Sequence, residues 1–307
     1  MAVLSIQNLK KRMNGRWILW DINLEISSAE IMAVLGKSDS GKTTLAKIIA
    51  GLDMADGGDI RILDEDNHQI KCPIALQKPA YVPQLTIYQN LDMFASLWGI
   101  PRRIKSKKIP FLLELLNLSD SRSLRPINVS SGALVKLELA RALLPESQFV
   151  IIDSLLDNLD HNVYEKVWDY ILETRRNNGR SYIIFTSNGK VSEMCNRLAV
   201  IHKGRFGFIG RPDDLRRLAG EDMVVLTDLH NPLLRNKLQE QFSMVVKEED
   251  GYLSVRVSNG EKALTDLVTE FGSELGCVYL KRPTLEDALD IISNENTSVL
   301  NTKAEKR

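Results

Sequence analysis

The stretch GKSDSGKTT, residues 36–44, combines residue types and a spacing that bind phosphate. It fits the pattern G-x-x-x-x-G-K-[ST], in which backbone N–H groups of a loop and of the helix that follows surround a polyphosphate. Lys42 would bring a positive charge to the terminal phosphates, and Thr43 would offer its hydroxyl to Mg²⁺. The residues expected to bind a nucleotide are Gly36, Lys37, Ser38, Asp39, Ser40, Gly41, Lys42, Thr43 and Thr44.

Asp39 is an unusual member of this loop, because loops of this kind often carry a further glycine at its position. Aspartate tolerates a left-handed backbone better than most residues, so the loop can still form. Its carboxylate would lie near the phosphates, which predicts a weakened nucleotide affinity unless the side chain points outward.

Strands and helices around the loop have the order of an α/β nucleotide-binding fold. Alternating or apolar runs predict strands at residues 3–9, 16–26 and 31–36, and the loop is followed by the helical pattern KTTLAKIIAGL. A helical stretch is expected from about residue 87 to 118. The runs FVIID and SYIIFTS are continuously apolar, which is typical of parallel strands buried on both faces.

A second, smaller domain is predicted after the hairpin sequence LAVIHKGRFGFIG. From residue 223 the pattern is strand, helix (PLLRNKLQEQF), strand, strand, helix, strand, which is the order of a ferredoxin-like α+β domain. The expected division is an ATP-binding domain at residues 1–218, with a helical subdomain at about 85–140, and a C-terminal domain at 219–292. The polar tail at 293–307 is expected to be disordered.

The balanced charge and the lack of long apolar runs limit the kinds of partner that the chain can bind. Lys and Arg number 40 and Asp and Glu number 40, so the net charge gives no support for a nucleic-acid partner or an anionic membrane surface. No apolar run approaches the roughly 20 residues that span a bilayer. A role at a membrane would therefore depend on another protein.

The order of motifs from about Val3 to Gly210 resembles the ATP-binding subunits of ABC transporters. The phosphate loop is followed by IALQKPAYVPQLTIYQNL, by VSSGALVKLELARALL, by FVIIDSLLDNLD and by YIIFTSNGKVSEMCNRLAVIHKGR. The resemblance implies an α/β P-loop domain of the ABC type with a helical subdomain, and ATP and Mg²⁺ as its ligands. The element KRPTLEDAL near the C-terminus resembles one found in exporter-type systems, so an exporter is expected.

The same resemblance assigns further site residues. Gln77, eight residues before L-T-[VI], would contact the metal and the attacking water, and Asp153 would hold Mg²⁺ together with Thr43. In this family the signature of one subunit closes over nucleotide held by the other. The matching residues here are Ser130, Ser131 and Gly132.

The chain departs from the family pattern where the family does its chemistry. Ser154 replaces the glutamate that polarises water, and Ser187 stands at the position of the switch histidine. A positioned general base contributes about 10²–10⁴-fold in rate. Asp157 is a nearby carboxylate, but it falls in the loop that faces the partner subunit, so we do not expect it to replace the glutamate.

The signature and the adenine-binding position are also altered. Ser131 replaces a glycine and Ala133 replaces a glutamine, which predicts a looser approach to the partner's nucleotide. Met13 holds the place of the aromatic residue expected to stack on adenine. Trp17 or Trp20 could stand in, and packing of both in the sheet is at least as good an interpretation.

These features predict an ATP-binding subunit that binds Mg-ATP but hydrolyses it poorly. A transmembrane permease subunit and a second, competent ATP-binding subunit are the implied partners, and the expected location is peripheral, at the cytoplasmic face of the membrane. One alternative is a slow ATPase that works as a homodimer. Another is a soluble ABC protein of DNA repair or translation, which would predict two ATP-binding modules or a long coiled coil, and the sequence shows neither.

Overall fold

The computed structural model describes residues 2–64, 66, 68–220, 222–227, 246–249, 252–257, 259–272 and 277–294. The described parts fall into two compact units, Met1–Pro212 and Asp213–Glu295. The division lies at the start of helix α7 (Pro212–Ala219), a little before the boundary expected at residue 218.

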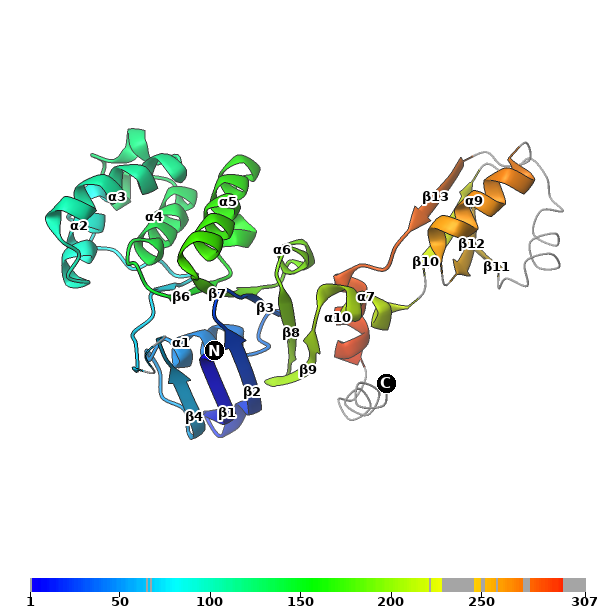
Figure 1. Ribbon diagram of the computed structural model, residues 1–307, viewed down its shortest axis with the longest axis horizontal. Helices are drawn as coiled ribbons and strands as arrows, with labels where there is room; N and C mark the ends of the chain where they lie inside the picture. The colour runs from blue at the N-terminus through cyan, green and yellow to red at the C-terminus, as the bar shows by residue number, and fades with distance from the viewer. Residues whose placement is uncertain are drawn as a thin grey trace. The chain divides into compact units, whose positions relative to one another are not determined.

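A six-stranded sheet in the order β5-β6-β7-β3-β8-β9 forms the centre of the first unit (Figure 1). Its strands pair in parallel except for β8 and β9, which form the antiparallel hairpin expected from the sequence. Every residue of β3, β6 and β7 is buried, as the apolar runs predicted. The strands are β3 (Ile31–Leu35), β5 (Ile74–Ala75), β6 (Phe149–Asp153), β7 (Ser181–Thr186), β8 (Arg197–His202) and β9 (Arg205–Gly210).

A second, antiparallel sheet has the order β2-β1-β4. It comprises β1 (Ala2–Met13), β2 (Arg16–Ser27) and β4 (Gly57–Ile62). Its inward residues share one apolar core with residues of β3, β6 and β7 and with helix α1 (Lys42–Ile49). Helix α1 therefore packs against both sheets. This packing fixes the phosphate loop, which connects β3 to α1.

The other helices of the first unit lie on the opposite side of the central sheet from β1, β2 and β4 (Figure 1). The helical stretch expected at 87–118 is present but is broken at Gly99 and Pro101. Thr86 begins α2 with a capping box that it shares with Gln89. The helices are α2 (Ile87–Leu97), α3 (Arg102–Leu115), α4 (Ser131–Leu143), α5 (His161–Asn178) and the short α6 (Gly189–Glu193), with 3₁₀ turns η1 (Ser119–Ser121), η2 (Pro126–Asn128) and η3 (Leu156–Asn158).

The second unit was predicted to be a ferredoxin-like domain, and its described strands agree with that prediction. Its antiparallel sheet has the order β11-β12-β10-β13, which is the strand order of that fold, and helix α9 packs its apolar face on it. The helix expected at PLLRNKLQEQF lies outside the described residues. The elements are β10 (Asp222–Thr227), β11 (Val246–Glu249), β12 (Tyr252–Val257), α9 (Gly260–Phe271), β13 (Cys277–Lys281) and α10 (Leu285–Asn294).

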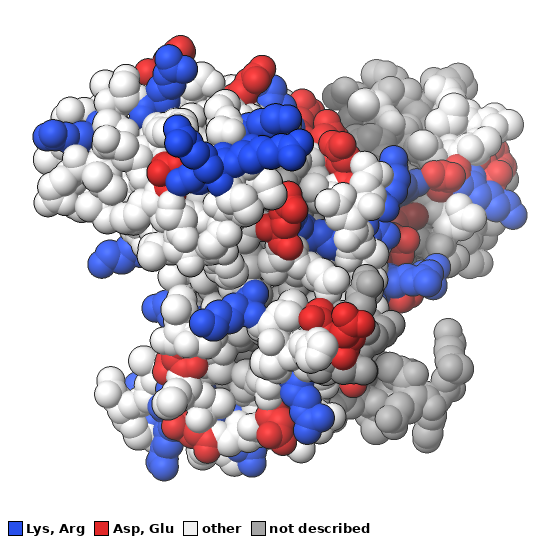
Figure 2. All heavy atoms as spheres, turned by 60° about the vertical axis from the view of Figure 1, so that its left-hand side comes forward, with Lys and Arg blue, Asp and Glu red and all other residues white. Residues whose placement is uncertain are grey.

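Charged side chains of both signs are interspersed on the face shown in Figure 2, where the largest blue group lies toward the top. This mixture agrees with the balanced composition of the chain. Among the described residues, no helix is both long and apolar enough to cross a membrane.

Candidate functional site

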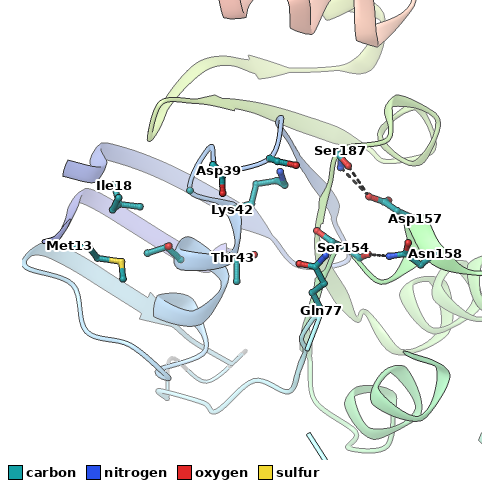
Figure 3. Close-up of a pocket in the computed structure, with 13 residues that line it drawn as sticks. Met13, Ile18, Asp39, Lys42, Thr43, Gln77, Ser154, Asp157, Asn158 and Ser187 are labelled. Carbon is teal, nitrogen blue, oxygen red and sulfur yellow. Dashed lines mark hydrogen bonds between the residues drawn. The ribbon is translucent and has the colours of Figure 1, made fainter. Parts of the chain in front are cut away.

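A pocket of about 550 Å³ opens over the phosphate loop (Figure 3). The end of β5, the turn after β6 and the end of β7 contribute to it, because carboxyl ends of neighbouring parallel strands meet at one edge of the sheet. The residues that line it are Met13, Ile18, Ser38, Asp39, Gly41, Lys42, Thr43, Thr44, Gln77, Ser154, Asp157, Asn158 and Ser187.

The phosphate loop has the backbone that its glycines and Asp39 predict. A Cβ atom on Gly36 would lie 2.6 Å from the carbonyl oxygen of Ile201, so only glycine fits there. Gly41 has a φ of 106° and begins α1, and Asp39 has a φ of 61°, in the left-handed region that aspartate tolerates. The start of α1 therefore faces the pocket, with its N–H groups in position for an anion.

Lys42 lies at the centre of the pocket, between Asp39 and Asp157 in Figure 3. Its Nζ donates hydrogen bonds to the carbonyl oxygens of Gly36 (2.6 Å) and Lys37 (2.9 Å). These two loop residues therefore hold the Lys42 side chain in place. Burial lowers the pKa of Lys42, and the negative charges of Asp153, Asp157 and Asp39 act in the opposite direction. A bound polyphosphate would add negative charge beside the ammonium group and so stabilise its charged form.

Asp153 and Thr43 meet as oxygen donors suited to a hard cation, and Gln77 lines the same pocket as Thr43. Asp153 is completely buried at the end of β6, and the hydroxyl groups of Thr43 and Ser154 both lie at its carboxylate. Its Oδ2 is buried and has no hydrogen-bond partner among the described residues. Burial raises the pKa of Asp153 because the charged form is poorly solvated. This unpartnered oxygen, with the Thr43 hydroxyl and Gln77, fits Mg²⁺, which binds carboxylate and other oxygen ligands.

Serines occupy the two positions where the resemblance predicts a catalytic glutamate and histidine. Ser154 and Ser187 both line the pocket, and their hydroxyl groups stand where a glutamate and a histidine were expected. Asp157 is close by, but its Oδ1 accepts a hydrogen bond from Thr186 Oγ1 (2.5 Å) and its Oδ2 accepts from the Ser187 N–H (3.1 Å) and Oγ (3.4 Å). Its carboxylate is thus held by the end of β7, across the pocket from Met13.

Asn158 and Ile18 line the pocket although sequence reasoning did not single them out. The Asn158 side-chain amide donates a hydrogen bond to the Ser154 carbonyl oxygen (3.0 Å). No sequence motif predicts this contact within the turn. Alternation along the strand puts Ile18 on the opposite face from Trp17, but it does not say which face turns to the pocket.

The tryptophans do not supply the surface expected for adenine. Trp17 and Trp20 contact each other edge to face, with ring centroids 4.5 Å apart, and neither lines the pocket. Arg12 and Lys10 lie over their rings. The apolar end of the pocket is formed instead by Met13 and Ile18, opposite the end that holds Ser187 and Asp157 (Figure 3).

The signature residues lie apart from this pocket. Ser130 caps α4, its Oγ accepting a hydrogen bond from the Ala133 N–H (3.2 Å), and Ser131 and Gly132 form the exposed first turn. A Cβ atom on Gly132 would meet only the Ser130 Oγ, at 3.8 Å. Nothing in the described part of the chain therefore requires a glycine there, and the amino end of α4 is open to another molecule.

Comparison with known proteins identifies the family. The family model described as ABC transporter matches residues 19–156. The sulfate/thiosulfate import ATP-binding protein CysA of Mesostigma viride is 32% identical over 221 residues, which are 70% of this chain and 63% of that protein. The chain belongs to the ATP-binding subunits of ABC transporters. The methionine import ATP-binding protein MetN of Clostridium acetobutylicum is 27% identical over 213 residues, 66% of this chain and 67% of that protein.

Solved structures agree on the fold. An ATP-binding subunit of an ABC transporter superposes with a TM-score of 0.64 at 24% identity, over 70% of this chain and 92% of that chain. A dimeric ATP-binding cassette in a post-hydrolysis state, bound to ADP and Pi, superposes with a TM-score of 0.60 at 22% identity, over 68% and 98% of the two chains.

The comparisons also correct one expectation. The relatives named above are import proteins, as are the spermidine/putrescine and glycerol-3-phosphate relatives. The exporter-type subclass, inferred from KRPTLEDAL, is contradicted by these names. That short element was a weaker guide than the first domain, which carries the similarity. ABC ATP-binding domains bind ATP with Mg²⁺, and the phosphate loop and oxygen donors of this pocket fit those ligands.

Proposed function

We propose that this chain holds Mg-ATP in the pocket over its phosphate loop and hydrolyses it poorly by itself. The observation that supports this most directly is the contrast within the pocket. Lys42, Thr43 and Asp153 supply groups for phosphate and metal, whereas Ser154 and Ser187, which line the same pocket as Lys42 and Thr43, offer only hydroxyl groups.

The pocket's shape suggests one orientation for the nucleotide. Met13 and Ile18 form an apolar end for the adenine, Lys42 and the start of α1 lie in the middle for the phosphates, and Ser187 lies at the far end (Figure 3). In this orientation the terminal phosphate would lie between Lys42 and Ser187.

The metal has an electrostatic role as well as a coordinating one. Asp39, Asp153 and Asp157 all act on Lys42 as negative charges. They would repel a polyphosphate that arrived alone, and a divalent cation would offset them. We therefore expect ATP affinity to depend strongly on Mg²⁺.

The deficit in hydrolysis follows from the groups that remain. A serine hydroxyl is not basic enough to take a proton from water near neutral pH. Asp157 is the carboxylate that could best act as a general base in place of the glutamate. However, Thr186 and Ser187 donate hydrogen bonds to its two oxygens and hold it toward β7. The acceleration of about 10²–10⁴-fold that a positioned general base provides is therefore missing.

The open end of α4 supports a partner subunit. Ser130, Ser131 and Gly132 are exposed and lie outside the chain's own pocket, so they would serve a nucleotide held by another subunit. We propose a second ATP-binding subunit that supplies its own glutamate and histidine, and a transmembrane permease subunit that both contact at the cytoplasmic face. In that assembly the ATP of this chain acts mainly as a clamp between the two subunits.

Nucleotide titration tests the binding part of this proposal. Lys42→Ala removes a charged donor to phosphate, worth about 1.5–3 kcal/mol, so we expect ATP affinity to fall by roughly 10–150-fold. Isothermal titration of both forms, with Mg²⁺ and with a chelator, measures this. Equal affinities for wild type and variant would place the nucleotide elsewhere.

A further inference from the structure

A buried carboxylate on the signature helix holds both ends of the loop that carries Gln77. Glu138 lies in α4 and is fully buried. Its Oε1 accepts a hydrogen bond from the Leu76 N–H (2.9 Å), and its Oε2 accepts from the Ala80 N–H (3.1 Å). The two bonds bracket Gln77, which itself is exposed in the pocket.

An arginine completes this arrangement, and we call Glu138 and Arg141 the α4 clamp. Arg141 Nε donates to Glu138 Oε2 (2.9 Å), and Arg141 Nη2 donates to Glu138 Oε1 and to the Ile74 carbonyl oxygen in β5 (2.8 Å). The guanidinium also lies over the ring of Phe94 in α2, 5.0 Å from its centroid. The clamp therefore ties α4 to α2, to β5 and to the Gln77 loop.

We propose that Glu138 is a positioning residue for Gln77, because its two hydrogen bonds hold the backbone on either side of Gln77. This inference rests on the proposed function, in which Gln77 faces Mg²⁺ bound with ATP. Glu138 touches neither nucleotide nor metal and acts only through the loop that it holds.

Arg141 holds this arrangement in place. It donates hydrogen bonds to both carboxylate oxygens of Glu138, so the carboxylate is kept in the orientation that accepts from the Leu76 and Ala80 amides.

Glu138→Gln is the direct test, read as ATP affinity with Mg²⁺ and with a chelator. The amide keeps the volume but cannot accept at both positions, so the Gln77 loop loses one of its ties. Residues that orient a metal site from behind typically contribute about 10–100-fold to metal affinity. We expect the enhancement of ATP affinity by Mg²⁺ to fall by about that factor, while the affinity for metal-free ATP stays the same.

Two further variants separate positioning from general damage. Ala80→Pro removes the N–H that Glu138 Oε2 accepts and leaves the Glu138–Arg141 pair intact, so it gives a reading even if Glu138→Gln folds poorly. Glu30→Gln is the matched control. Glu30 is a nearly buried carboxylate that accepts from the Ser27 N–H (2.8 Å) and from Arg197 (2.9 Å), away from the pocket residues. It should cost stability and leave the Mg²⁺ enhancement unchanged.

A double-mutant cycle gives the decisive comparison. If Glu138 acts through Gln77, Gln77→Ala and Glu138→Gln should each reduce the Mg²⁺ enhancement, and the double variant should lose no more than Gln77→Ala alone. Additive losses, or an equal loss of affinity with and without Mg²⁺, would overturn the inference. If wild type itself showed no ATP binding, the proposed function would fail instead, so the two failures are distinguishable.

Discussion

Replacing Asp153 by asparagine should make the nucleotide-free protein more stable while removing its response to Mg²⁺. The carboxylate is fully buried, its Oδ2 has no hydrogen-bond partner among the described residues, and burial raises its pKa. Keeping this carboxylate ionised therefore lowers the folding stability when no metal is present. Asparagine has nearly the same shape and carries no charge.

The size of the effect comes from the charge, because asparagine also leaves a polar atom at the unpartnered position. An unsatisfied buried polar group costs about 1–3 kcal/mol, and we take the further cost of its charge to be of about the same size. In a domain of roughly 150–250 residues, ~1 kcal/mol moves Tm by about 2–4 °C, which gives a rise of about 2–12 °C for Asp153→Asn. Because the folded-state pKa is raised, wild-type stability from this group is present at low pH and is lost as pH rises through that raised value. The advantage of the variant should therefore be full at neutral pH and vanish below the ordinary pKa of 3.8.

Thermal unfolding in the presence of a chelator, measured across a range of pH, tests the predicted gain in stability. Thermal unfolding with Mg-ATP tests the predicted loss of the response to Mg²⁺. Asp157→Asn is the matched control, since Thr186 and Ser187 donate to both of its carboxylate oxygens and an amide cannot accept at both. That variant should lower Tm, and Mg-ATP should still stabilise it. A fall in the Tm of Asp153→Asn without nucleotide, or Mg²⁺-dependent stabilisation that survives the change, would refute this account of Asp153.

Two further sets of variants test the site. Ser154→Glu should raise turnover only modestly, and adding Ser187→His should raise it by more than the product of the single effects, because both groups act on one water and one phosphate; strictly multiplicative rates would count against this. Gly36→Ala should destabilise the unit by about 1–3 kcal/mol, because its Cβ atom would meet the Ile201 backbone oxygen at 2.6 Å. Gly132→Ala, where the space is open, should leave the unfolding free energy unchanged or slightly raised, and an equal loss for both glycines by chemical denaturation would contradict the packing argument.

Sequence reasoning reached the parts of the site that lie on strand ends and glycine turns. The phosphate loop follows from residue spacing, because the conformation of its backbone is local. The family resemblance assigned Gln77, and the structure places Gln77 in the pocket lining. The parallel sheet followed from the continuous apolar runs, and the ferredoxin-like strand order from the sequence of elements.

Contacts between distant segments could not be predicted in this way. The tie between Asp157 and Ser187 joins residues of two loops that meet only because β6 and β7 are neighbours in register. Glu138 reads in the sequence as one polar position of a helix, and its burial depends on how α4 packs on β5. The tryptophan pair illustrates the same limit, since the twist of β1 and β2 decides which face of the strand turns to the pocket.

ATP turnover by the purified chain alone is the most direct test of the central claim that the pocket binds Mg-ATP and lacks the groups to cleave it. Lys42→Ala, purified in parallel, reports any contaminating ATPase. At saturating Mg-ATP we expect wild type to bind nucleotide and to show no turnover above the Lys42→Ala preparation. A turnover of several per second in wild type, absent from Lys42→Ala, would show a competent site and contradict the account.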